Sequence, residues 1–135
     1  MSRSLALAAI LILIFSHTAY NQQNGIYGKW YFDRFGGPHG EIVKDGEIAK
    51  ANKRNEGFSF DFTKENTMIV TQSSGKTMKV PYKLFPDRKE VIIQGDTMRI
   101  MLLTADILEL YPTSDTKPAL FLKRTKNGKT SMSAH

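Results

Sequence analysis

The 135-residue sequence has no cysteine, one tryptophan and three histidines. A domain without cysteine has no disulfides, so its core alone must keep it folded. Two histidines, His17 and His135, lie in the terminal segments, which leaves His39 in a long loop. A metal site needs several converging ligands, and a triad needs a histidine near a serine. Asp45 and Glu47 have no acid or base partner that the sequence identifies. We therefore expect no metal, no cofactor and no enzymatic activity.

Long apolar runs are also scarce, and the longest, residues 5–15, has eleven residues. As a helix it would span about 16 Å, roughly half of a bilayer core. It follows Arg3 and precedes the short segment Ser16–Ala19, which is the arrangement of a signal peptide. We predict a signal peptide over residues 1–19 and an exported protein, periplasmic or secreted. A buried N-terminal helix and an uncleaved anchor are the alternatives.

The basic residues do not gather in one block. Residues 20–135 carry eighteen Lys and Arg and thirteen Asp and Glu, a net charge of +5, and these charges are scattered between the apolar runs. This distribution favours an ordinary solvated surface over a nucleic-acid footprint. We expect no nucleic-acid partner. We also expect no stable membrane anchor after cleavage, because acylation at the cleavage site requires cysteine.

Short apolar runs recur every eight to twelve positions after residue 25, with turn residues between them. The clearest is residues 57–63, where Phe58, Phe60 and Phe62 alternate with polar residues, the period of a β-strand. The expected strands are residues 26–34, 57–63, 67–72, 76–85, 90–94, 97–103, 107–111 and 119–124. Eight short antiparallel strands in sequence order favour an all-β fold, an eight-stranded up-and-down barrel, because closure removes exposed sheet edges.

Two segments fall outside this pattern. Residues 35–56 form a long connection, a type that is usually functional or mobile. Its section 47–53 is compatible with one or two turns of helix. Residues 126–135 are polar and basic, and we predict a disordered tail. The expected barrel domain therefore covers residues 20–125.

The motif Gly28-Lys29-Trp30 at the start of the first strand, together with the eight runs, resembles the lipocalins. The hairpin over residues 103–110 is similar to small bacterial lipocalin-like domains. The resemblance covers roughly residues 25–125. It implies that Trp30 packs across the closed end of the barrel against a basic residue near the last strand, and Arg124 is the best candidate. A barrel-closing role for Gly28, Trp30 and Arg124 is structural, so the tryptophan is not expected to contact a ligand.

Strand parity predicts which side chains point inward. The inward positions are Phe58, Phe60, Phe62, Met78, Val80, Tyr82, Met98, Ile100, Leu102, Leu108, Leu110, Leu120 and Leu122. From these we select the candidate ligand-binding lining: Phe58, Phe60, Phe62, Met78, Tyr82, Met98, Ile100 and Leu110. An apolar, aromatic and methionine-rich set is typical of ligand cavities, but also of ordinary cores.

Two functions follow from these alternatives. The first is an exported lipocalin-like protein that binds a small apolar or amphipathic ligand in the barrel mouth, under the connection over residues 35–56, without catalysis. The second is an envelope or surface protein with a filled barrel, whose partner is a protein or polysaccharide. In that case the contact surface would include Tyr27, Tyr31, the long connection and the basic tail.

Overall fold

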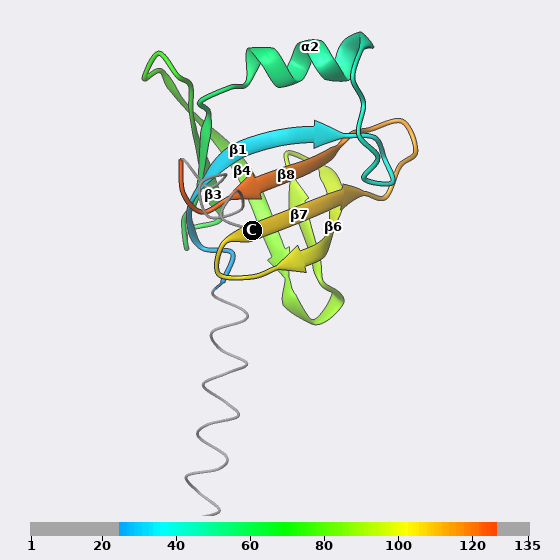
Figure 1. Cartoon of the computed structure of the whole chain (residues 1–135). Helices are drawn as coiled ribbons and strands as arrows, with labels where there is room; N and C mark the ends of the chain where they lie inside the picture. Colours follow the sequence, from blue (N-terminus) through cyan, green and yellow to red (C-terminus); the bar gives the residue numbers. More distant parts are fainter. Residues whose placement is uncertain (1–24, 127–135) are drawn as a thin grey trace, which may run out of the picture.

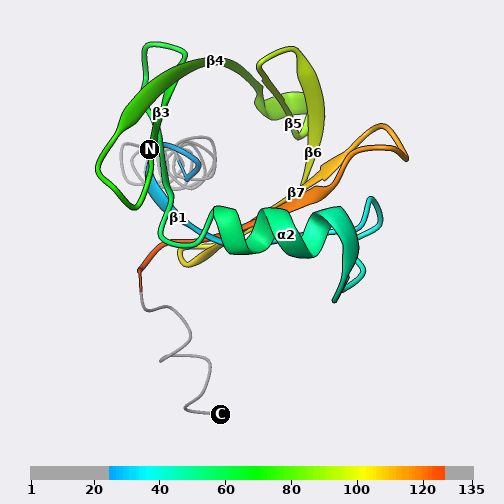
Figure 2. The same cartoon turned by 90° about the horizontal axis from the view of Figure 1, so that it is seen from above.

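The computed structural model describes residues 25–126, which form a closed antiparallel barrel. Each strand pairs with the next along the chain, and the last strand pairs back with the first (Figures 1 and 2). The strands are β1 (Gly28–Gly36), β2 (Ser59–Phe62), β3 (Thr67–Thr71), β4 (Thr77–Phe85), β5 (Glu90–Ile93), β6 (Asp96–Leu103), β7 (Ile107–Pro112) and β8 (Ala119–Lys123). The helices are α2 (Gly46–Arg54) and the 3-10 turn η1 (Pro86–Arg88). The predicted all-β, eight-stranded, up-and-down barrel is confirmed.

Because the barrel is a meander, successive connections alternate between its two ends. We call one end the closed end, because Ile26 and Trp30 are fully buried there. The segments at the closed end are residues 25–29, 63–66, 83–90, 103–107 and 124–126. We call the opposite end the mouth. Its segments are residues 36–58, 72–77, 94–96 and 113–118.

One hydrophobic core lies inside the barrel. Its largest fully buried side chains are Trp30, Phe62, Ile26, Leu108, Leu110, Leu122 and Val91. The ring of Phe62 packs edge-on against Tyr82, with centroids 5.0 Å apart. Apolar burial of this kind is the main favourable term in folding, and here it acts without any disulfide.

Two register shifts change which residues face the core. The pairing of β6 with β7 shifts between Ile100 and Leu102, so that Leu102 lies opposite Glu109 and Leu103 opposite Leu108. Leu108 is fully buried, whereas Leu102 is 40% exposed. The prediction that Leu102 points inward is therefore wrong, because the inserted residue reverses the alternation and Leu103 packs on the core in its place. A second shift lies between Phe32 and Arg34.

The long connection between β1 and β2 carries α2, as the sequence analysis expected. The helix has no buried residue, and it lies along β1 at the mouth (Figures 1 and 2). Its Asn52 side chain bonds to the backbone of Phe35 twice. Oδ1 accepts the Phe35 N–H at 2.5 Å, and Nδ2 donates to the Phe35 carbonyl at 3.3 Å. One side chain therefore satisfies both backbone groups of a strand residue and holds the helix to the barrel.

No helix among residues 25–126 is long and apolar enough to cross a membrane. The predicted signal peptide, residues 1–19, lies outside the described residues. So do residues 127–135 of the predicted tail.

Candidate functional site

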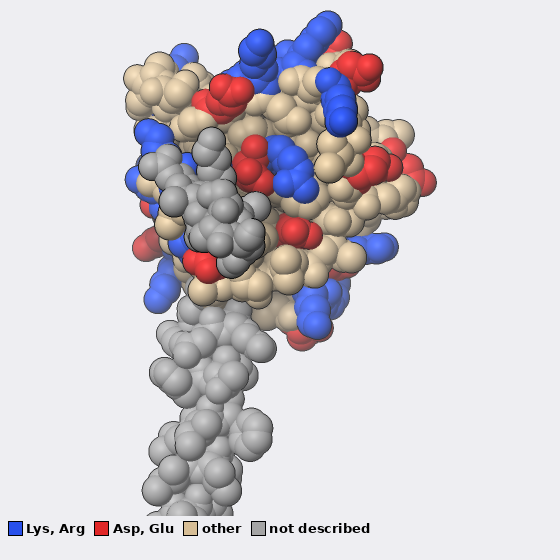
Figure 3. Space-filling model, in the orientation of Figure 1, with Lys and Arg blue, Asp and Glu red and all other residues tan. Residues whose placement is uncertain are grey.

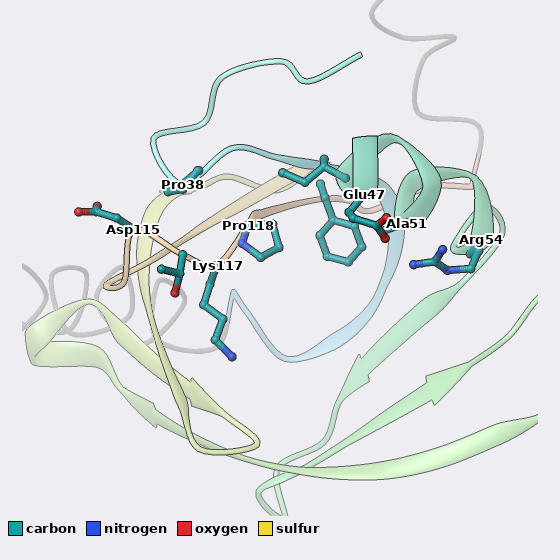
Figure 4. Close-up of a pocket in the computed structure, with 10 residues that line it drawn as sticks. Pro38, Glu47, Ala51, Arg54, Asp115, Lys117 and Pro118 are labelled. Atoms are coloured by element: carbon teal, nitrogen blue, oxygen red, sulfur yellow. The ribbon is translucent and has the colours of Figure 1, made fainter. Parts of the chain in front are cut away.

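A pocket of about 440 Å³ lies at the mouth, between α2 and the barrel rim (Figure 4). Its residues come from the end of β1, the following loop, α2 and the connection between β7 and β8. They are Phe35, Pro38, Glu47, Ile48, Ala51, Arg54, Asp115, Thr116, Lys117 and Pro118. Half of them are apolar and half polar, and the volume is within the range of small-molecule sites.

The apolar part of the pocket continues the barrel core. Phe35 is half-buried and packs on the core cluster, with its ring 5.1 Å from that of Phe32. Ile48 and Ala51 lie three residues apart on α2, so they share the face of the helix that is turned to the pocket. A molecule in the pocket would therefore be held between α2 and the mouth end of the core.

A tight turn over residues 37–41 shapes the pocket wall. The Gly37 N–H donates to the Glu41 carbonyl at 2.8 Å, and the Gly40 N–H donates to the Gly37 carbonyl at 2.9 Å. The Glu41 carboxylate accepts the His39 N–H at 2.9 Å. Hydrogen bonds to that carboxylate from the backbone of Glu41 itself and from the backbone of His39 lower the pKa of Glu41. Gly40 has φ +84° and lies directly against the Tyr111 hydroxyl, so no side chain fits at this position.

The charged groups around the pocket are mostly paired. Lys117 lies 3.4 Å from Asp96, and Glu47 lies 3.6 Å from Lys50. Within residues 25–126, Arg54 has no ion pair, and Figure 4 shows its side chain turned toward the open space below α2. The lining thus holds two basic and two acidic side chains, and Arg54 is its cation without an ion pair among the described residues.

None of the eight predicted lining residues belongs to this pocket. Five are buried in the core: Phe60, Phe62, Tyr82, Met98 and Leu110. Phe58 and Ile100 are half-buried and pack against them. Met78 pairs with the inward-facing Val70 but is 51% exposed, because it lies at the mouth end of β4. The sequence predicts a ligand under the connection over residues 35–56, and six of the ten pocket residues lie in that connection. None of these six is among the predicted lining residues, because their arrangement depends on how the connections pack on the folded barrel.

The predicted barrel-closing residues meet at the closed end. The Arg124 guanidinium carbon lies 3.6 Å from the centroid of the Trp30 ring, which is the pairing that the resemblance implies. The Trp30 indole N–H donates to the Ile26 carbonyl at 2.8 Å. Gly28 has φ +105°, and a Cβ there would lie 3.4 Å from the Arg124 guanidinium. The glycine of the motif thus allows the positive-φ backbone conformation, and the arginine packs close beside it.

Tyr82, the one polar member of the predicted lining, directs its hydroxyl to the closed end. That hydroxyl donates to the Thr63 carbonyl. Burial, followed by the nearby groups Tyr27, Glu65 and Asp61, raises the pKa of Tyr82 above its usual value. The hydroxyl therefore lies far from the mouth pocket and has a protein partner.

His39 lies on the exposed rim of the pocket. Its Nε2 is 3.6 Å from Asp115, and both side chains are largely in solvent, so this pair contributes little. Among residues 25–126 no three His, Cys, Asp or Glu side chains converge in a way that would hold a metal ion.

Comparison with known proteins identifies solved structures of similar fold but no related sequence. No family model matches the sequence, and no curated protein matches it. The fold is similar to the crystal structure of a DUF4847 family protein from Bacteroides vulgatus ATCC 8482, with a TM-score of 0.57. The match covers 76% of this chain and 97% of that one, at 16% sequence identity. At this identity the similarity concerns the fold alone.

Proposed function

We propose that this protein is an exported, lipocalin-like binding protein that holds a small amphipathic molecule in the mouth pocket and performs no catalysis. The observation that carries the proposal is the pocket itself, in which apolar side chains from the core edge and from α2 lie next to Arg54, which has no ion pair within residues 25–126. A closed barrel with a helix at the rim of its mouth is compatible with ligand binding.

The chemistry of the pocket favours an anionic amphiphile. Phe35, Ile48 and Ala51 offer an apolar surface, and removing such surface from water stabilises a complex by about 25 cal/mol per Å² before the cost of association. Arg54 presents a planar set of donors that matches a carboxylate. We therefore expect dodecanoate to bind more tightly than dodecanol, which has the same chain length but no charge.

Calorimetric titration of the full chain with these two compounds tests the proposal. Arg54→Ala should weaken dodecanoate binding about tenfold, because it removes a charge-assisted hydrogen bond, and should leave dodecanol binding nearly unchanged. Lys53→Ala is the matched control, since Lys53 is adjacent on α2 but does not line the pocket. Ile48→Asp should weaken the binding of both compounds.

Native mass spectrometry of the protein purified from its own host complements the titration. A small molecule that co-purifies stoichiometrically and leaves on unfolding would support the proposal. Equal effects of Arg54→Ala and Lys53→Ala on dodecanoate binding would contradict it. Trp30 is buried at the opposite end, so its fluorescence serves as a probe of unfolding and not of pocket occupancy.

One observation favours a second candidate function. Seven large side chains are fully buried within the described barrel, as in a filled core. A filled barrel would act through its outer surface, on a protein or polysaccharide partner. An apo mass in native spectrometry, together with no binding of either amphiphile, would favour this second function.

A further inference from the structure

We propose that the closed end of the barrel docks on an anionic lipid surface, so that the mouth pocket faces away from the membrane. The proposal is independent of whether the pocket holds a ligand. It follows from the charge, the aromatic contacts and the apolar side chains of the closed end, and from the position of Gly25.

Charge differs between the two ends. The mouth segments carry equal numbers of basic and acidic residues, and Figure 3 shows both kinds intermixed around α2. At the closed end basic residues exceed acidic ones. The basic residues there are Lys29, Lys64, Lys83, Arg88, Lys89, Arg124 and Lys126, and the acidic ones are Glu65, Asp87, Glu90 and Asp106. The excess of positive charge therefore lies at one end of the barrel.

An aromatic ring lies among these cations. The Arg88 guanidinium carbon is 4.1 Å from the centroid of the Phe85 ring, and the Lys83 ammonium is 5.2 Å from it. At the other side of the closed end, the Lys64 ammonium lies 5.9 Å from the Tyr27 ring. Aromatic rings and basic side chains are the residues that concentrate at a membrane–water interface.

Two apolar side chains add to this surface. Met101 is 55% and Leu102 is 40% exposed, and both lie at the closed-end part of β6, where Met101 has outward parity and the register shift turns Leu102 out of the core. They are near the Phe85 hairpin, because the Ile100 N–H donates to the Lys89 carbonyl at 2.8 Å. Exposed apolar side chains beside cations suit shallow insertion between anionic headgroups.

The position of Gly25 supports the same orientation. The described chain starts at the closed end, where the Gly25 carbonyl accepts a hydrogen bond from Arg124 at 2.6 Å (Figure 1). Nine residues, 16–24, separate Gly25 from the apolar run over residues 5–15. Nine residues span at most about 30 Å. While that run is in a membrane, this connection keeps the closed end within about 30 Å of the lipid surface.

Vesicle sedimentation tests the proposal. Residues 25–126 contain all eight strands and the core, so a chain that starts at Tyr20 keeps the whole barrel and lacks the apolar run. We expect it to bind vesicles of phosphatidylcholine mixed with phosphatidylglycerol, and not vesicles of phosphatidylcholine alone. Binding should fall steeply between about 0.05 M and about 0.5 M salt.

Charge-reversal variants distinguish binding through a specific surface at the closed end from binding that depends only on the net charge of the protein. Lys64→Glu with Lys83→Glu should lower binding to anionic vesicles by at least about tenfold. Lys44→Glu with Lys76→Glu makes the same change of charge at the mouth, on exposed residues, and should lower it by less than about threefold. Met101→Ser with Leu102→Ser should weaken binding but keep the preference for anionic vesicles. Circular dichroism checks that each variant is folded.

Three outcomes would overturn the proposal. Equal loss of binding in both charge-reversal pairs would mean that only net charge matters. Equal binding to neutral and anionic vesicles would remove the role of the basic residues. Binding to dextran sulfate without binding to anionic vesicles would assign the closed end to an acidic polysaccharide instead.

Discussion

The guanidinium of Arg124 lies over the indole of Trp30, with 3.6 Å between Cζ and the ring centroid. The same guanidinium donates hydrogen bonds to three backbone carbonyls, those of Gly25, Tyr27 and Lys29, at 2.6, 3.3 and 3.3 Å. Arg124 therefore joins the end of the last strand to the segment that leads into the first. This contact closes the barrel at the end opposite the pocket.

Arg124→Ala should destabilise the barrel by about 2–4 kcal/mol, because it removes the cation–π contact and leaves carbonyls without their donor. Arg124→Lys keeps the charge but not the planar set of donors, and should recover less than half of this loss. Urea unfolding followed by Trp30 fluorescence measures both variants. Lys126→Ala, two residues further on, is the control and should change stability by less than about 0.5 kcal/mol. An Arg124→Ala variant as stable as that control would show that the contact is incidental.

Gly28→Ala should be more destabilising than Gly75→Ala. Both glycines have a positive φ, +105° and +93°, so both substitutions strain the backbone. Only at Gly28 would the new methyl group approach Arg124, whereas the space around Gly75 is open. We expect a cost of about 1 kcal/mol at Gly75 and about 2 kcal/mol or more at Gly28. Thermal unfolding of the two variants compares them directly, and equal losses would leave backbone strain as the whole explanation.

Asn52→Ala should release α2 from the barrel without unfolding the sheet. The substitution removes both hydrogen bonds to the Phe35 backbone, and the helix has no buried residue to hold it otherwise. Hydrogen exchange should become faster in α2 and at the Phe35 amide, while the amides of β3 and β4 keep their protection. Asn55→Ala is a matched control, because the Asn55 side chain bonds within the helix, to the Ala51 carbonyl at 2.7 Å. Unchanged exchange in Asn52→Ala would show that other contacts hold the helix.

Stability should fall at high pH through Tyr82. Burial raises the pKa of Tyr82 in the folded barrel above its value in the unfolded chain. The stabilisation from its neutral form is complete below about pH 10 and is lost as the pH rises further, because the unfolded chain then releases the proton first. Tyr82→Phe should cost about 1–2 kcal/mol near neutral pH, through the unpaired Thr63 carbonyl.

Urea unfolding at several pH values measures this dependence of stability on the ionisation of Tyr82. In Tyr82→Phe the loss of stability above about pH 10 should be smaller than in the original protein. Tyr31→Phe, on the outer face of β1, should leave that loss as it was. If Tyr82→Phe and the original protein lose stability in parallel, the alkaline transition arises from other groups.

The alternation of apolar and polar residues determined the barrel. Phe58, Phe60 and Phe62 show a strand period that no helix would share, and turn residues separate the eight runs. Gly28 and Trp30 at the start of the first strand indicated where the barrel closes. Gly28 adopts a positive φ, and the large side chain of Trp30 is fully buried at that end. These are local properties of the chain, and a sequence displays them directly.

The register and the pocket were decided by tertiary structure. The inserted residue in β6 turns Leu102 outward, although its parity with Met98 and Ile100 predicts an inward position. Phe121 has outward parity in β8, yet it is buried, because Arg34 stacks on its ring at 4.0 Å and Tyr111 packs against it at 5.9 Å. Such outcomes depend on how neighbouring strands pair.

The mouth pocket combines residues that are up to 83 positions apart, from Phe35 and Pro38 to Lys117 and Pro118. No local pattern links these residues, since the connections that carry them meet only after the barrel has closed and Asn52 has bonded to Phe35. The sequence by itself therefore determined the strands, their order and the closing residues. Strand register and loop packing, which arise from contacts between distant residues, decided where a ligand could be held.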